Sequence, residues 1–355
     1  MRVTNKMLSN SFLADMNTNL QNMQKLQKQM TSGKEINKPS DDPAKVARAM
    51  QLTTDISANE QYNKNINNTT NWLDTTDTAL NQAGNVLQKV RELLVSAGNA
   101  AYGSSERQSI KDEINQRIDE LTQILNTNYD GKYVFGGTST STKPVATIAI
   151  PDNLGNLVNK GIDYNATAPD PSDPKYTGPT DPLYITDLQN YNIELNKINK
   201  KMTVEISQGV TMEYNVTAGD LLEFNNESGA ACDLRSILKG ITEHLDGNVY
   251  DGTNWVQDPA AATSELPNND LQGITDTINN LLKIRSQVGA KQNRMENSAS
   301  KNQDENFNLT SILSKTEDID ITQKTMEYAT MQTVYMASLQ TSARVIQPTL
   351  LDFLK

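Results

Sequence analysis

A run of apolar residues at every seventh position restricts how this chain can fold more than any other feature. The large members of this run are Ile66, Leu73, Leu80, Leu87 and Leu94, and the residues three positions after each are Thr69, Thr76, Ala83, Val90 and Ala97. A sustained heptad repeat predicts a long helix that winds gently left-handed against partner helices. The repeat therefore predicts an elongated helical architecture.

The second set of seam residues is mostly small, so a neighbouring helix can approach closely. An isolated two-stranded coiled coil would carry bulkier residues at both seam positions. We therefore interpret the segment as part of a rod of several helices and keep the two-stranded coiled coil as the alternative. Asp41 or Asp42 is expected to cap this helix, with Pro43 at its first position. Gly103 is expected to end it.

Both ends of the chain carry an apolar stripe at helical spacing. The N-terminal stripe consists of Leu13, Met16, Leu20, Met23 and Met30, and the C-terminal stripe consists of Tyr328, Met331, Tyr335, Leu339, Ile346 and Leu350. Chain ends are usually polar and frayed, because few contacts hold them. Two apolar ends predict an interface that neighbouring molecules complete on assembly.

A second half of the rod is expected towards the C-terminus. Its seam residues are Ile274, Ile278, Leu281 and Val288, after Asp270 as the expected cap. Arg285 and Gln292 interrupt this seam and are expected at a boundary of the packed face. Before the middle of the chain, Ser105 and Gln108 match a capping box, and a turn at Asp130-Gly131 predicts a short hairpin.

The middle of the chain has a different character. It is rich in Pro, Thr, Asp, Asn and Gly, and alternating apolar residues around Ser207-Gln208-Gly209 predict two strands joined by a short turn. One short amphipathic helix is expected near 234–245. The predicted fold is mainly α, a coiled-coil-like rod from both chain ends, with a short β-hairpin and an inserted mixed, mainly β domain. The predicted segments are 1–42 (N-terminal assembly helix and loop), 43–139 (rod with hairpin), 140–266 (insertion), 267–305 (returning rod helix) and 306–355 (C-terminal assembly helix).

Charge and composition argue against several classes of partner. The chain has 43 acidic and 32 basic residues, a formal charge of −11, and no basic stripe that could neutralise phosphates. We therefore expect neither nucleic-acid binding nor attraction to anionic membranes. No apolar run is long enough for membrane insertion, and the first residues lack the apolar stretch of a cleaved signal peptide.

Residues suited to catalysis or metal binding are scarce. His244 is the single histidine and Cys232 the single cysteine, so histidine-based nucleophilic pairs and Cys-rich metal sites are not expected. We interpret His244 as a solvated surface residue and Cys232 as a packed or surface thiol. Asp41-Asp42 is explained by helix capping, and Asp318 and Asp320 by a solvated face. The sequence predicts no enzyme, no cofactor and no metal.

Three motifs resemble those of the flagellin family. Ser32-Gly33 leads through a short loop to the paired aspartates Asp41-Asp42, Val90 to Leu94 resembles the arginine–glutamate–leucine step of the long helix, and Val288 to Arg294 resembles the motif of the returning helix. The similar parts cover roughly 1–140 and 265–355. Within the family, the segment Tyr133 to Thr138, the triplet Asp42-Pro43-Ala44 and the ending Gln347 to Lys355 resemble the hook-associated protein 3 branch.

The resemblance implies a structural subunit at the junction between hook and filament, on which flagellin polymerises. It further implies export through the flagellar type III channel to an extracellular position, without a cleaved signal peptide. The implied partners are a ring of copies of the chain itself, the first hook–filament junction protein, flagellin and an export chaperone. The alternatives are flagellin itself and, from another class, a coiled-coil surface protein or an enzyme with a helical stalk.

Overall fold

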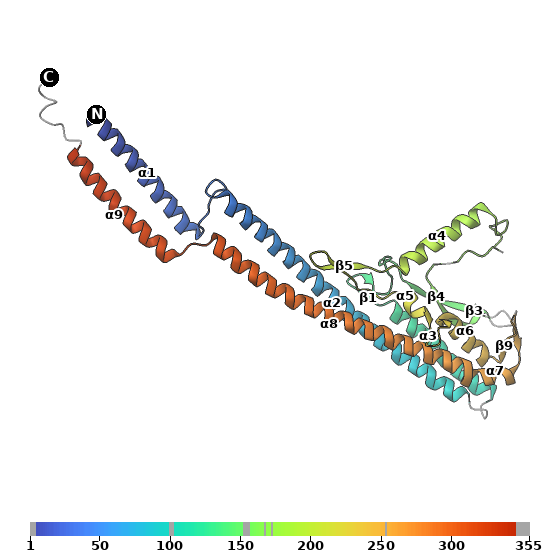
Figure 1. Cartoon of the computed structure of the whole chain (residues 1–355). Coiled ribbons are helices and arrows are strands. Elements are labelled where there is room, and N and C mark those ends of the chain that lie inside the picture. Colours follow the sequence, from blue (N-terminus) through green and yellow to red (C-terminus); the bar gives the residue numbers. More distant parts are fainter. Residues whose placement is uncertain are drawn as a thin grey trace, which may run out of the picture. The chain divides into compact units, whose positions relative to one another are not determined.

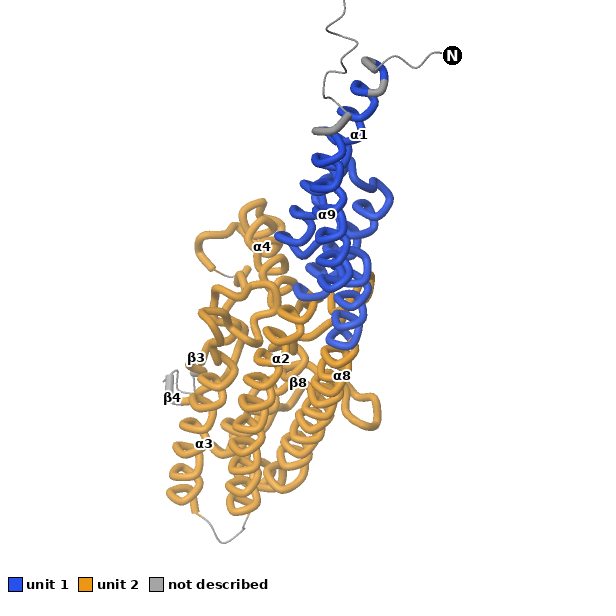
Figure 2. The backbone as a smooth tube through the Cα atoms, turned by 90° about the vertical axis from the view of Figure 1, so that its left-hand side faces the viewer, with its two compact units in different colours: residues 1–61, 302–355 blue, residues 62–301 orange. Residues whose placement is uncertain are grey.

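The chain folds into two compact units in this computed structural model (Figures 1 and 2). Unit 1 consists of Met1–Gln61 with Asn302–Lys355, and unit 2 of Tyr62–Lys301. The structure describes residues 5–98, 103–151, 157–166, 168–171, 173–252 and 254–345. The fold is mainly α, as the sequence predicts. The five-segment division proposed from the sequence stays a prediction.

Unit 1 is built from helices alone apart from one isolated bridge. Helix α1 (Asn5–Ser32) packs against α9 (Ile321–Val345), and the two lie side by side in Figures 1 and 2. The first part of α2 (Pro43–Ala97) and the last part of α8 (Leu271–Glu317) complete the unit. Helix α1 ends at Gly33, which adopts φ +71° and donates its N–H to the Gln29 carbonyl at 2.8 Å. A left-handed glycine after the last turn is a common helix stop.

In unit 1, the loop between α1 and α2 lies against the connection between α8 and α9. The Glu35 N–H donates to the Glu317 carbonyl at 2.6 Å, and the Ile319 N–H donates to the Gly33 carbonyl at 3.1 Å. Asp42 caps α2 by accepting from the N–H groups of the second and third helical residues, both at 3.1 Å. The expectation of a capping aspartate before Pro43 is therefore confirmed for Asp42.

A break between α8 and α9 places Asp320 at the start of α9. Its Oδ1 accepts from the N–H groups of Thr322 at 2.9 Å and Gln323 at 3.1 Å. Asp318 and Asp320 are both exposed, as the expected solvated face requires, and each also makes a local hydrogen bond. Asp320 is a cap, and Asp318 accepts a hydrogen bond from the Ser314 hydroxyl at 2.5 Å.

The hydrophobic core lies in unit 2, where α2, α3 (Ser104–Leu125) and α8 run alongside one another (Figure 2). Heptad spacing brings one face of α2 into this core, because residues seven apart fall on the same side of a helix. Arg285 donates from Nε to Asp77 Oδ1 at 2.9 Å, and Gln292 donates to Asp74 at 2.7 Å. These polar residues therefore join α8 to α2 beside the apolar seam, at the boundary expected for them.

The insertion contains paired strands and several helices. The described antiparallel pairs are β1 (Asn128–Tyr129) with β2 (Lys132–Tyr133), β3 (Val145–Pro151) with β4 (Leu157–Tyr164), β5 (Thr203–Ser207) with β6 (Val210–Glu213), β7 (Glu223–Asn225) with β8 (Ala231–Asp233), and β9 (Asn248–Tyr250) with β10 (Trp255–Gln257). The helices are α4 (Pro182–Ile198), α5 (Ala218–Leu222), α6 (Leu234–Leu245) and α7 (Pro259–Glu265). Both predicted hairpins and the predicted helix α6 are present. Helix α4 was not expected, so the insertion is mixed without being dominated by strands.

Two local expectations are wrong. The chain is already helical before Asp270: a π-helical turn η1 (Leu266–Asp270) joins α7 to α8, so Asp270 is no cap. Helix α3 begins at Ser104 with Gly103 as its N-cap, two residues before the expected cap Ser105, and Glu106 accepts from the Gly103 N–H at 2.9 Å. Cys232, in strand β8, is half-buried, in agreement with the packed or surface thiol expected, and burial raises its thiol pKa.

Candidate assembly interface

The described part of unit 1 has almost no hydrophobic interior. Its fully buried apolar side chains are Ala49 and Leu52, whereas unit 2 contains all the other buried apolar side chains of the described chain. Two packed helices can cover only one stripe of each other, and the remaining faces stay open. Unit 1 therefore presents much of its apolar surface to solvent.

The predicted assembly residues fall into three groups. Those on the packed faces of α1 and α9 are half-buried, namely Met16, Leu20, Met23, Met30, Tyr328, Met331 and Tyr335. Leu13 and Leu339 are exposed, at 44% and 42%. Ile346 and Leu350 lie outside the described residues.

Sequence reasoning missed part of the packed stripe on α1. Phe12 and Leu26 are half-buried there, and Gln29 is 5% exposed. Gln29 donates from Nε2 to the Glu35 carbonyl at 2.6 Å, so this polar residue joins the helix to the following loop. Leu26 lies three residues after Met23, and this spacing could have identified it, whereas Phe12 and Leu13 both lie at helical spacing before Met16.

Helix α9 also exposes several large apolar side chains outside the stripe that packs on α1. The most exposed of them are Ile321, Met326, Val334, Met336 and Leu339, at 42–63%. Phe307 on α8 is 76% exposed and Met50 on α2 is 66% exposed. Scattered exposed apolar residues are normal, but gathered ones indicate interaction sites.

A groove of about 380 Å³ borders the loop after α1. Ile36, Pro39, Val46 and Met50 supply much of its apolar lining. Lys34 pairs with Glu317 at its rim.

The loop beside the groove is fixed by charge. Lys45 pairs with Glu35 at 2.7 Å. The Asn37 and Lys38 backbone N–H groups lower the pKa of the Asp41 carboxyl, because they stabilise its charged form. The carboxylate therefore holds the loop in one conformation.

The predicted rod-seam residues lie in the core of unit 2. Ile66, Leu73, Leu80, Leu87, Leu94, Ile274, Ile278, Leu281 and Val288 are each at most 7% exposed. Side chains this buried stabilise the fold of the single chain and offer no surface to a partner. The interface and the core are therefore different residue sets.

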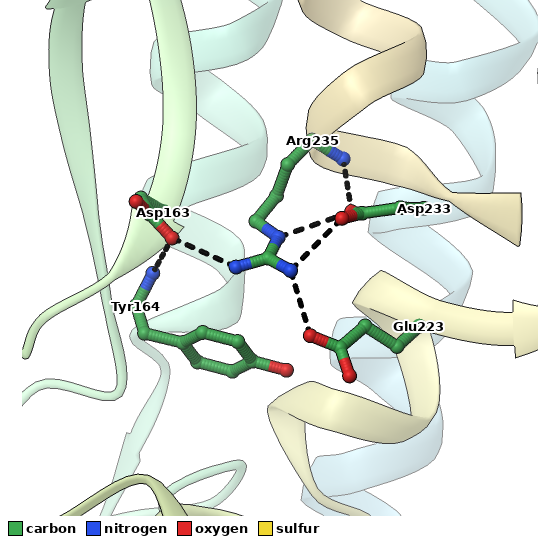
Figure 3. Close-up of polar contacts among 5 residues, drawn as sticks. All are labelled: Asp163, Tyr164, Glu223, Asp233 and Arg235. Atoms are coloured by element: carbon green, nitrogen blue, oxygen red, sulfur yellow. Dashed lines mark hydrogen bonds and ion pairs between the residues drawn. The ribbon is translucent and has the colours of Figure 1, made fainter. Parts of the chain in front are cut away.

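An arginine joins the elements of the insertion (Figure 3). Arg235 on α6 donates to Asp163 at 3.0 Å, to Glu223 at 2.7 Å and to Asp233 at 2.8–3.0 Å. Its guanidinium lies 4.9 Å from the centre of the Tyr164 ring. Burial alone would lower the pKa of Arg235, but these carboxylates raise it. One cation thus links β4, β7, β8 and α6.

His244 is not a solvated surface residue, contrary to expectation. Its side chain is 11% exposed, its Nδ1 lies 2.7 Å from Asp270 Oδ2, and its ring packs edge-on against Trp255. Burial raises the pKa of Asp270 more than the histidine lowers it. The pair joins α6 to η1.

Within the described ranges, no three side chains of the His, Cys, Asp and Glu types gather as metal ligands. No described helix combines the length and apolarity that crossing a bilayer requires. The feature that stands out is the open apolar surface of unit 1.

Two family models match this chain. Residues 3–140 match the bacterial flagellin N-terminal helical region, and residues 271–354 match the bacterial flagellin C-terminal helical region. The flagellin of Bacillus subtilis strain 168 is 26% identical over 342 residues, which cover 95% of this chain and 94% of that protein. Flagellar hook-associated protein 3 of Escherichia coli K12 is 22% identical over 339 residues, which cover 95% of each chain.

Solved structures share the fold. Hook-associated protein 3 of Legionella pneumophila superposes with a TM-score of 0.54 at 14% identity, over 75% of this chain and 98% of that chain. FlgL of Xanthomonas campestris superposes with a TM-score of 0.51 at 15% identity, over 73% and 98% of the two chains. At these identities the likeness concerns the fold.

Proposed function

Because this chain belongs to the flagellin family, we propose that it is a structural subunit of the bacterial flagellum at the junction between hook and filament, on which flagellin polymerises. The observation that carries the proposal is the incomplete packing of unit 1. Its described residues bury two apolar side chains and leave large ones exposed along α9. Surface of this kind becomes stable when neighbouring subunits cover it, so assembly and ordering are linked.

The proposed partners follow from this surface and from the family. Copies of the chain would form a ring, with the first hook–filament junction protein on one side and flagellin on the other. An export chaperone would cover the C-terminal stripe before assembly, because an exposed apolar helix invites aggregation. The proposed location is extracellular, in the flagellum, reached by type III export. A structural role requires neither a catalytic site nor a cofactor.

Flagellin itself is the second candidate. The 26% identity to a flagellin, against 22% to a hook-associated protein 3, favours it. The Tyr133 to Thr138 segment favours the junction role, since it resembles the hairpin of the hook-associated protein 3 branch. In this chain Val134 and Phe135 are fully buried next to the β1–β2 hairpin. Family membership argues against a non-flagellar coiled-coil protein or a stalked enzyme.

Deletion of the gene separates the two candidates. A junction subunit predicts intact hooks without filaments and flagellin shed into the medium. Counting copies gives a second criterion: about one ring per flagellum supports the junction, whereas thousands of copies would show that the chain is the filament subunit.

A charge substitution tests the interface itself. Leu339→Asp should abolish filament attachment, because a carboxylate would be buried without a partner when a neighbour covers α9. The matched control is Leu183→Asp on α4, since Leu183 is similarly exposed at 51% but lies in the insertion. Normal attachment in the Leu339 variant would contradict the assignment.

A further inference from the structure

A lysine-rich cavity of about 300 Å³ lies in unit 2. Lys201, Lys283 and Lys291 line it, together with Asp220, Glu223 and Gln287. Helix α8 supplies Lys283, Gln287 and Lys291. Asp220 lies in α5, Glu223 begins β7, and Lys201 precedes β5. The chain carries a formal charge of −11, so three ammonium groups at one cavity are a local departure from the overall charge.

The two carboxylates of the cavity are already engaged. Asp220 Oδ2 accepts from the Thr217 N–H at 2.8 Å and from the Thr217 hydroxyl at 2.9 Å, and it pairs with Lys201. Glu223 receives the Arg235 guanidinium at 2.7 Å. Their negative charge is therefore partly neutralised by groups other than Lys283 and Lys291.

Among the described residues, Lys291 is a cation of the cavity without an ion pair, as is the exposed Lys283. Lys291 is half-buried, and within the described parts of the chain no carboxylate lies within ion-pair distance of its ammonium group. Burial lowers its pKa, the charge of Lys201 lowers it further, and the attraction of Asp220 and Glu213 does not make up the difference. A half-buried ammonium group without a counter-ion favours the uptake of an anion.

We propose that this cavity binds a small multivalent oxyanion, with Lys291 and Lys283 as its principal ligands. Lys201, which also pairs with Asp220, would be a third ligand. Ammonium groups bind phosphate and carboxylate oxygens as point charges, with three donors each. Gln287 is exposed at the rim and can donate its amide to the same ligand. A volume of about 300 Å³ is at the lower end of ligand pockets and suits one small molecule. The proposal does not depend on the junction role.

The test titrates the full chain with inorganic phosphate, and separately with succinate, at pH 7 and constant ionic strength, by calorimetry. Loss of one charged hydrogen bond costs about 1.5–3 kcal/mol, so Lys291→Met should weaken binding at least about tenfold. Lys283→Met should weaken it about threefold or more. Lys239→Met, which removes an exposed lysine of α6, is the matched control and should leave binding unchanged.

Two further measurements distinguish a loss of anion binding from a loss of folding. Lys291→Arg retains the charge and should bind within a few-fold of the parent chain. NMR titration of Lys291 should show its pKa rising when phosphate is added, because an anion stabilises the ammonium form. The proposal is overturned if neither anion binds, or if Lys291→Met and Lys239→Met bind equally. Binding that varies with protein concentration would point to a contact between copies and would overturn it as well.

Discussion

Replacing one leucine in each unit by alanine should separate folding from assembly. Leu80 is fully buried in the core of unit 2, whereas Leu339 is 42% exposed on α9. Leu80→Ala removes buried methyl groups and leaves a cavity, which costs about 2–5 kcal/mol. For a unit of 240 residues, counted from 62 to 301, this lowers the melting temperature by roughly 4–20 °C.

Leu339→Ala should behave in the opposite way. Its side chain already meets solvent, so the free chain loses at most about 1 kcal/mol and no closed cavity forms. Polymerisation of flagellin on the chain should nevertheless weaken, because a neighbour would bury the missing methyl groups. Leu183→Ala, at a leucine 51% exposed, is the control for exposure alone.

The assay combines thermal melts followed by circular dichroism with seeded flagellin polymerisation followed by light scattering. Equal losses of melting temperature in the Leu80 and Leu339 variants would refute the reasoning, because α9 would then belong to the core of the free chain. Unchanged polymerisation in the Leu339 variant would refute it equally.

Three further substitutions test individual contacts. Arg235→Leu leaves three carboxylates without their shared cation and should cost roughly 2–4 kcal/mol in urea unfolding, a loss that Arg235→Lys should only partly avoid. Asp270 has a raised folded pKa, so its contribution to the free energy of unfolding should fall as pH rises from about 4 through that pKa. Asp270→Asn should remove this slope when the two pH profiles are subtracted, and an unchanged slope would assign it to other groups. Asp320→Ala removes two capping bonds and should cost about 1 kcal/mol of helix stability. Far-ultraviolet dichroism should then show frayed helix, while the melt of unit 2 stays the same.

The long helices could be predicted because their spacing alone determines which residues are buried. Leu73, Leu80 and Leu94 are fully buried, as a helix with a seven-residue repeat requires. Helix α4 was missed although its start carries the same signal that identified α2. Asp181 caps it, accepting from the Leu183 N–H at 2.8 Å, and Pro182 follows. The start of α4 could therefore have been predicted from this aspartate–proline cap, despite the other prolines nearby.

The interface and the buried pair were less predictable, because they depend on contacts between distant residues. The choice between Phe12 and Leu13 as the packed residue depends on where α9 lies, which the spacing within α1 does not contain. His244 and Asp270 are 26 positions apart and meet only through the packing of α6 on η1. The sequence could identify both residues but not their contact.

The uneven distribution of buried surface affects what calorimetry of the free chain measures. Unfolding absorbs about 0.7 kcal/mol per residue near 60 °C for chains with a packed interior. A cooperative transition confined to the 240 residues of unit 2 corresponds to about 170 kcal/mol, against about 250 kcal/mol for 355 packed residues. Part of the difference would be released as heat when the exposed faces of the terminal helices pack among neighbours, so the enthalpy of polymerisation contains a delayed part of the enthalpy of folding.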